Sequence, residues 1–85
     1  MNLNLTKGMD GDLVEEIATS DDISVLMVAM QKWKDKNKGN YKIEPYSRFL
    51  FHKEDGKLVI DFGDYGYFLL ISGIADWSMV NSVFK

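Results

Sequence analysis

Few side chains in this sequence could take part in chemistry. His52 is the only histidine, and there is no cysteine. Thiol nucleophiles, disulfides and thiolate zinc sites are therefore excluded, and His52 has no second imidazole with which to bind zinc. The sequence also lacks a phosphate-binding glycine loop with its lysine and a Gly-x-Ser-x-Gly turn. We expect no catalytic residues, no metal and no other cofactor.

Asp61 and Asp64 form a closely spaced carboxylate pair within a glycine-rich turn, Asp61-Phe62-Gly63-Asp64-Tyr65-Gly66. Calcium loops take oxygen ligands from more positions at fixed spacing, and a two-carboxylate hydrolase needs a cleft that a chain of 85 residues scarcely provides. Aspartates in turns commonly accept hydrogen bonds from nearby backbone N–H groups. We expect that structural role here.

Six cations form a basic patch near the middle of the chain: Lys32, Lys34, Lys36, Lys38, Lys42 and Arg48. Aromatic residues at 33, 41 and 46 lie among them, an arrangement that can stack nucleic-acid bases. However, lysines at a helix C-terminus also stabilise the helix dipole, the net charge is −3, and no RNA-recognition aromatic motif occurs. Nucleic-acid binding is therefore the alternative hypothesis, ranked behind protein binding.

Aromatic residues are concentrated in the second half, where 9 of the 11 lie between positions 41 and 77. Six of them define the predicted partner-binding aromatic surface: Tyr46, Phe49, Phe51, Tyr65, Tyr67 and Phe68. Tyrosine and phenylalanine bury large areas at low entropic cost, so they dominate many interfaces. Tyr65 sits in a turn flanked by glycines and Tyr46 follows Pro45. We expect these two tyrosines to be the exposed anchors.

These candidate sites need positioning elements, and the first half of the chain predicts three of them. Alternation over 2–6 predicts a strand that ends at Lys7-Gly8. Asp12 with Glu15 three residues later has capping-box spacing, which predicts a short helix over 12–19. Apolar residues at helical spacing predict a second helix over 21–38 with Gly39 as its C-cap.

The second predicted helix is apolar on two sides. Met30 and Trp33 belong to the side that we expect in the core, whereas Val25, Val28 and Ala29 fall on the opposite side. A helix that is apolar on two sides is usually covered on both sides by other parts of the protein or by a partner. This pattern, together with the short length of the chain, leaves room for a homo-oligomer.

The rest of the chain predicts an antiparallel meander with strands over 46–53, 57–62 and 67–72. Pattern alone leaves open which edge strand pairs with the first strand. The segment 76–84 fits a helix or a strand. One sheet face collects Leu58, Ile60, Phe62, Tyr67, Leu69 and Ile71, and we assign Phe49, Phe51, Val59, Phe68 and Leu70 to the other.

One segment of the meander resembles a known family. Residues 57–73 read KLVIDFGDYGYFLLISG and are similar to the strand–glycine turn–strand segment of the SMI1/KNR4 immunity-protein superfamily. The similarity covers a fifth of the chain. It implies a function in binding and neutralising another protein.

Together these observations predict a single α+β domain over 1–85 in the order β-α-α-β-β-β followed by a helix or strand. The expected sheet is antiparallel with three to four strands, and the helices pack on one face. No stretch approaches the roughly 20 apolar residues that span a bilayer, and no signal peptide is evident, so we expect a cytoplasmic protein without membrane contact. The expected function is a non-enzymatic protein-binding module of the inhibitor or immunity type, encoded by a bacterium, phage or mobile element. A structural homodimer subunit is a further alternative.

Overall fold

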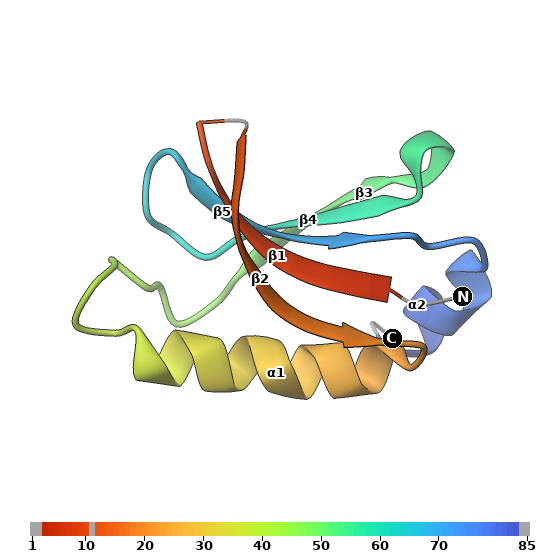
Figure 1. Ribbon diagram of the computed structural model, residues 1–85, viewed down its shortest axis with the longest axis horizontal. Coiled ribbons are helices and arrows are strands. Elements are labelled where there is room, and N and C mark those ends of the chain that lie inside the picture. The colour runs from red at the N-terminus through yellow and green to blue at the C-terminus, as the bar shows by residue number, and fades with distance from the viewer. Residues whose placement is uncertain (1–2, 11, 84–85) are drawn as a thin grey trace.

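The chain begins with two strands that pair with each other (Figure 1). In the computed structural model, which describes residues 3–10 and 12–83, β1 spans Leu3–Met9 and β2 spans Asp12–Ser20. Met9 stands opposite Asp12. The intervening sequence Asp10-Gly11 is a strong hairpin signal, and Asp10 has the positive φ, 52°, that such turns need.

The prediction of a helix over 12–19 is wrong, because this segment is β2. Its backbone pairs with β1 along almost its whole length. Val14, Ile17 and Thr19 are β-branched and favour a strand, and from β2 the side chains of Ile17 and Ala18 pack against the core. Pairing with β1 outweighs the local capping-box spacing of Asp12 and Glu15.

The first strand is also longer than predicted, since Lys7 and Gly8 lie inside β1 and do not end it. Gly8 is buried and pairs with Phe68 of the strand on the other side. An aromatic ring that covers a strand glycine compensates for its missing side chain. The strand therefore continues through a residue that usually interrupts one.

The helix predicted over 21–38 is confirmed as α1, Ile23–Lys36. Asp22 is its N-cap, and its Oδ1 accepts hydrogen bonds from the Ser24 hydroxyl at 2.7 Å and the Ser24 backbone N–H at 2.9 Å. These bonds, the hydroxyl's first, hold the pKa of Asp22 below its usual value. The C-cap is Asn37 and not Gly39: the Asn37 backbone N–H donates to the Trp33 and Lys34 carbonyls, and its side-chain amide also donates to the Trp33 carbonyl at 2.8 Å.

The predicted meander is confirmed, with slightly shorter strands. It consists of β3 (Arg48–His52), the 3₁₀ turn η1 (Lys53–Asp55), β4 (Lys57–Asp61) and β5 (Tyr67–Ser72). β4 pairs antiparallel with both β3 and β5. The terminal segment is a helix, α2 (Trp77–Val83), with Asp76 accepting from the Ser78 hydroxyl and backbone N–H at its start. Position 84 of the predicted segment lies outside the described residues.

The sheet has five antiparallel strands in the order β2-β1-β5-β4-β3, so the prediction of three to four strands undercounts it. The additional strand is β2, the segment assigned to a helix. β1 pairs with β5, which settles the edge that the pattern left open. As Figure 1 shows, α1 runs along one side of the sheet, and α2 lies near the first turn of α1.

One face of the sheet packs against both helices and forms the core. Met30 and Trp33 of α1 are 5% and 6% exposed, which confirms their predicted place in it. The other fully or nearly fully buried members come from strands, loops and helices: Leu3, Leu5, Ile23, Leu26, Leu58, Ile60, Phe62, Leu69, Ile71, Ile74 and Val80. With both helices on this face, the opposite face of the described sheet has no helix above it.

Candidate functional site

The sheet face that points away from the helices carries the candidate site. A row of side chains crosses it, because Leu50 of β3 stands opposite Val59 of β4, Val59 opposite Leu70 of β5, and Leu70 opposite Thr6 of β1. Leu70 is only 6% exposed, whereas Leu50 at the edge of the row is 53% exposed. The face is therefore apolar at its centre and open toward β3.

An open groove with a volume of about 810 Å³ lies on this face, and we call it the outer groove. Leu50, Val59 and Phe68 form its apolar floor. The β4–β5 loop, Gly63 to Gly66, supplies one wall, and the segment 44–46 that leads into β3 supplies another. A groove of this size can accept several side chains of a peptide or one small molecule.

Two tyrosines stand on the rim of the outer groove. Tyr65 is 98% exposed in the β4–β5 loop, and Tyr46 is 88% exposed just before β3. Neither phenol ring has a place in the core. Large side chains held in the open beside a groove are suited to close over a bound segment.

Hydrogen bonds hold the two walls of the outer groove together. The Glu44 backbone N–H donates to the Phe62 carbonyl at 2.8 Å, and the Lys42 backbone N–H donates to Asp64 Oδ2 at 3.1 Å. Ser47, next to Tyr46, accepts from the Lys34 ammonium at 2.9 Å. The segment before β3 is thus tied to α1 and to the β4–β5 loop, so both walls are preorganised.

Gly63 is required where the two walls meet. Its φ is +116°, and a Cβ on it would lie 2.3 Å from Glu44 Cγ. Any larger residue would therefore meet both backbone strain and a steric clash. At the other end of the loop, the Asp10 backbone N–H donates to the Gly66 carbonyl at 2.8 Å, which brings the β1–β2 turn to the groove.

The charge of the outer groove is negative. Among the described residues that line it, the carboxylates of Asp10, Glu44, Asp61 and Asp64 face a single cation, Arg48. Arg48 already pairs with Asp61 at 3.2 Å. Lys42 lies 3.3 Å from Glu44, but it does not line the groove. The surface therefore favours cationic ligands over anionic ones.

The predicted aromatic surface is divided between the two faces of the sheet. Tyr46, Tyr65, Tyr67 and Phe68 line the outer groove, although the Tyr67 ring also packs against Tyr41, 5.0 Å away between centroids. Phe49 and Phe51 were assigned to the wrong face. They stand opposite the buried Ile60 and Leu58, and Phe49 packs on the core while the ring of Phe51 contacts that of Trp77. Cross-strand pairs share a face, so the register decides this.

The basic patch does not form one continuous cationic surface. Lys34 is 6% exposed and bonded to Ser47, so its assignment to the patch is wrong. Lys38 and Lys42 lie within 3.4 Å and 3.3 Å of Asp35 and Glu44, and Arg48 pairs with Asp61. Lys32 and Lys36 are exposed on α1. Most cations of the basic patch are therefore either paired with a nearby carboxylate or buried.

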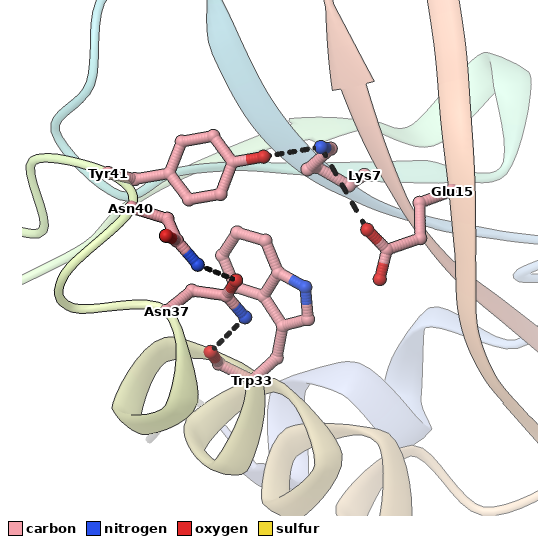
Figure 2. Close-up of polar contacts among 6 residues, drawn as sticks. All are labelled: Lys7, Glu15, Trp33, Asn37, Asn40 and Tyr41. Atoms are coloured by element: carbon pink, nitrogen blue, oxygen red, sulfur yellow. Dashed lines mark hydrogen bonds and ion pairs between the residues drawn. The ribbon is translucent and has the colours of Figure 1, made fainter.

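A cation near the core was missed by the sequence reasoning (Figure 2). The Lys7 ammonium of β1 donates to the Tyr41 hydroxyl at 2.6 Å, lies 3.9 Å from Glu15 and stands 4.9 Å from the Tyr41 ring centroid. Tyr41 in turn stacks on Trp33, with centroids 5.4 Å apart. The period-two pattern of β1, which places Lys7 on the face of Leu5, could have shown it.

The Lys7 contacts have a structural explanation. They fix Tyr41, and Asn40 donates to Asn37 at 3.2 Å while Asn37 donates to Trp33, as Figure 2 also shows. The chain after α1 is thereby folded back under the sheet toward the groove wall at Glu44. Lys7 thus ties β1 to the loop that follows α1.

Of the two aspartates of the β4–β5 turn, only Asp61 accepts a hydrogen bond from the nearby backbone, as predicted for both. Asp61 accepts from the Gly63 backbone N–H at 3.0 Å, as in a local turn, whereas Asp64 accepts from Lys42, far away in sequence. His52 is exposed at the end of β3. In the described part of the chain, no three histidine, aspartate or glutamate side chains come together in a group that could hold a metal ion.

No protein-family model, no curated protein and no solved structure matches this chain. The similarity to immunity proteins therefore rests on residues 57–73 alone. Over residues 3–10 and 12–83, no helix is long and apolar enough to cross a membrane.

Proposed function

We propose that this chain is a non-enzymatic protein-binding module of the inhibitor or immunity type, and that it binds a cationic segment of a partner protein in the outer groove. The observation that carries the proposal is the combination, in one groove, of an apolar floor, two highly exposed tyrosines and an excess of carboxylates. The first two features account for the affinity, and the third accounts for the chemistry of the partner.

The apolar floor and the tyrosines account for affinity. Leu50 at the floor and Tyr65 at the rim are 53% and 98% exposed, so a bound segment would remove much apolar and aromatic surface from water. Interfaces owe most of their binding free energy to a few such residues. The hydrogen-bonded walls reduce the entropy lost on binding, because little has to become ordered.

The carboxylates account for the chemistry of the partner. A segment with lysine or arginine beside apolar residues would place its cations near Asp10, Asp64 and Glu44 while its apolar side chains cover Val59 and Phe68. The exposed rings of Tyr46 and Tyr65 can also receive a cation on their faces. A phosphate backbone would meet repulsion on this surface, which disfavours nucleic acid as the ligand of the groove.

The test uses two capped peptides of equal length, one alternating lysine with leucine and the other alternating glutamate with leucine. Each is titrated into isotopically labelled protein while NMR shifts are followed. We expect the lysine peptide alone to shift the amides of Leu50, Val59 and Phe68. Tyr65→Ala and Tyr46→Ala should each weaken binding by about 1–2 kcal/mol without unfolding the protein.

Lys36→Ala is the matched control, because Lys36 is exposed on α1 and does not line the groove. It should leave peptide binding unchanged. Equal shifts with the glutamate peptide, or shifts confined to α1, would contradict the proposal. Tight binding of a short DNA duplex that weakens steeply with salt and requires Lys36 would instead favour the nucleic-acid alternative.

A further inference from the structure

The back of α1 carries a second apolar surface without a partner in the described chain. Val25 and Val28 are 50% and 56% exposed, although the opposite side of the same helix is buried in the core. With Ser24, Ala29 and Lys32 they line a shallow concavity of about 360 Å³. We call these five residues the α1 stripe. It shares no residue with the outer groove.

The spacing along this side of the helix is that of a coiled-coil seam. Val25, Val28 and Lys32 follow one another along α1 at intervals of three and four residues, and Asp21, which precedes the N-cap Asp22, lies four residues before Val25. This is the interval at which the contact positions of two paired helices recur. Ser24 and Ala29 lie beside the two valines and are small, so a second helix can approach closely.

The stripe is complementary to itself when the second helix runs antiparallel. A two-fold axis that passes between Leu26 and Met27 places Val25 opposite Val28 of the other copy, and Ser24 opposite its Ala29. The same axis places Lys32 beside the N-terminal end of the other helix, which Asp21 and the N-cap Asp22 precede. Both valine pairs and both opposite-charge pairs then form at once, as an isologous interface requires.

A parallel pair would lack this complementarity. Lys32 would face Lys32 and Asp21 would face Asp21, so like charges would meet at both ends of the contact. The two helix dipoles would also be aligned in the same direction. Charge therefore selects the antiparallel arrangement.

We propose that the α1 stripe is the interface of a two-fold homodimer in which two α1 helices pack antiparallel. One helix stripe buries less than the roughly 1,200–2,000 Å² of a standard protein interface, so the dimer dissociates on dilution. The two outer grooves stay open in such a dimer, because each groove lies on the sheet face that points away from α1. Two grooves on one particle would strengthen the binding of a partner that offers two segments.

The first experiment is sedimentation of the 9.7 kDa chain over a range of concentrations. We expect a shift from monomer to dimer as concentration rises. Val28→Glu should abolish the shift without unfolding the protein, since the residue is half exposed. Leu13→Glu is the matched control, because Leu13 is 57% exposed on β2 outside the stripe, and it should dimerise like the wild type. A wild type that stays monomeric throughout, or a Val28→Glu variant that still dimerises, would overturn the proposal.

The second experiment tests the direction of packing. The chain contains no natural cysteine, so introduced thiols report only their own contacts. A mixture of one chain carrying Val25→Cys and another carrying Val28→Cys should form a disulfide-linked dimer under mild oxidation, and each chain alone should do so far less. Efficient cross-linking of each variant with itself would contradict the antiparallel geometry.

Charge exchange gives a third readout. Lys32→Asp and Asp21→Lys should each weaken dimerisation at least several-fold at low salt, and the double variant should restore it because both charges are reversed together. A double variant as weak as the single ones would show that these charges do not meet.

Discussion

The ring of Phe68 lies directly on the backbone of Gly8 across two paired strands. A Cβ at Gly8 would come within 2.1 Å of Phe68 Cζ and within 2.6 Å of two further ring atoms. The absence of a side chain at Gly8 therefore sets the position of Phe68, which forms part of the floor of the outer groove. β1, which contributes no floor residue of its own, shapes the groove through this contact.

Gly8→Ala should destabilise the fold and disturb the groove. The added methyl group must displace a packed aromatic ring, and such overpacking typically costs about 1–3 kcal/mol. Chemical denaturation measures the loss of stability, and NMR shifts of Phe68 report the ring displacement. Gly39→Ala is the control, because a Cβ there has nothing within 4 Å, and it should leave the stability nearly unchanged. Equal effects at the two glycines would show that the contact with Phe68 does not explain the result.

Trp33→Ala should destabilise the protein by about 3–5 kcal/mol, enough to unfold a domain this small. Trp33 is 6% exposed and its ring contacts the rings of Tyr41 and Phe62. Thermal unfolding followed by circular dichroism measures the effect. Tyr65→Ala, at a ring that is 98% exposed, should keep the wild-type melting temperature. A stable Trp33→Ala variant would show that the indole contributes little to the core.

Lys34→Ala should be destabilising, in contrast to Lys36→Ala two residues later. Lys34 is 6% exposed and its ammonium donates to Ser47, so the variant loses a hydrogen bond and the packing of the lysine stem, about 1–3 kcal/mol in total. Lys36 is exposed, and its loss should change stability by less than about 0.5 kcal/mol. Urea unfolding compares the two variants. Identical stabilities would indicate that the Lys34–Ser47 bond contributes nothing net.

The two N-cap aspartates should make the fold sensitive to acid. Hydrogen bonds from Ser24 and Ser78 hold the pKa values of Asp22 and Asp76 below the usual 3.8. A group with a lowered pKa in the folded state stabilises the protein above its unfolded-state pKa, and this contribution is lost as pH falls from there through the folded-state value. The melting temperature should therefore fall as the solution is acidified through and below pH 3.8.

Asp22→Asn and Ser24→Ala should each reduce this acid-dependent fall, since each removes one side of the charged cap. Ser82→Ala serves as the control, because the Ser82 hydroxyl donates to the Met79 carbonyl and to no carboxylate. Melting temperatures measured on both sides of pH 3.8 test the prediction. An unchanged pH dependence in Asp22→Asn would contradict it.

The amino-acid sequence by itself determined the elements whose signals are local and agree with one another. The apolar spacing from Ile23 to Trp33 and the aspartate before it predict α1 because one buried stripe and one cap specify a helix without reference to the rest of the chain. The turns after β3 and β4 likewise predict the antiparallel meander. The exposure of Tyr46 and Tyr65 also follows from their neighbours in sequence.

Only the tertiary structure decided where local signals conflicted or where a partner strand sets the outcome. Asp12 and Glu15 have the spacing of a helix start, yet this segment pairs with β1 as a strand, from which Ile17 and Ala18 pack against the core. The sheet face on which Phe49 and Phe51 lie depends on the register of β3 with β4. A shift of one residue would move both side chains to the other face. The outer groove brings together residues of β3, β4, β5 and three loops, and the buried Lys34 bonds to Ser47 at the far end of the loop that follows α1. Such proximities arise from chain folding and have no counterpart in residue spacing.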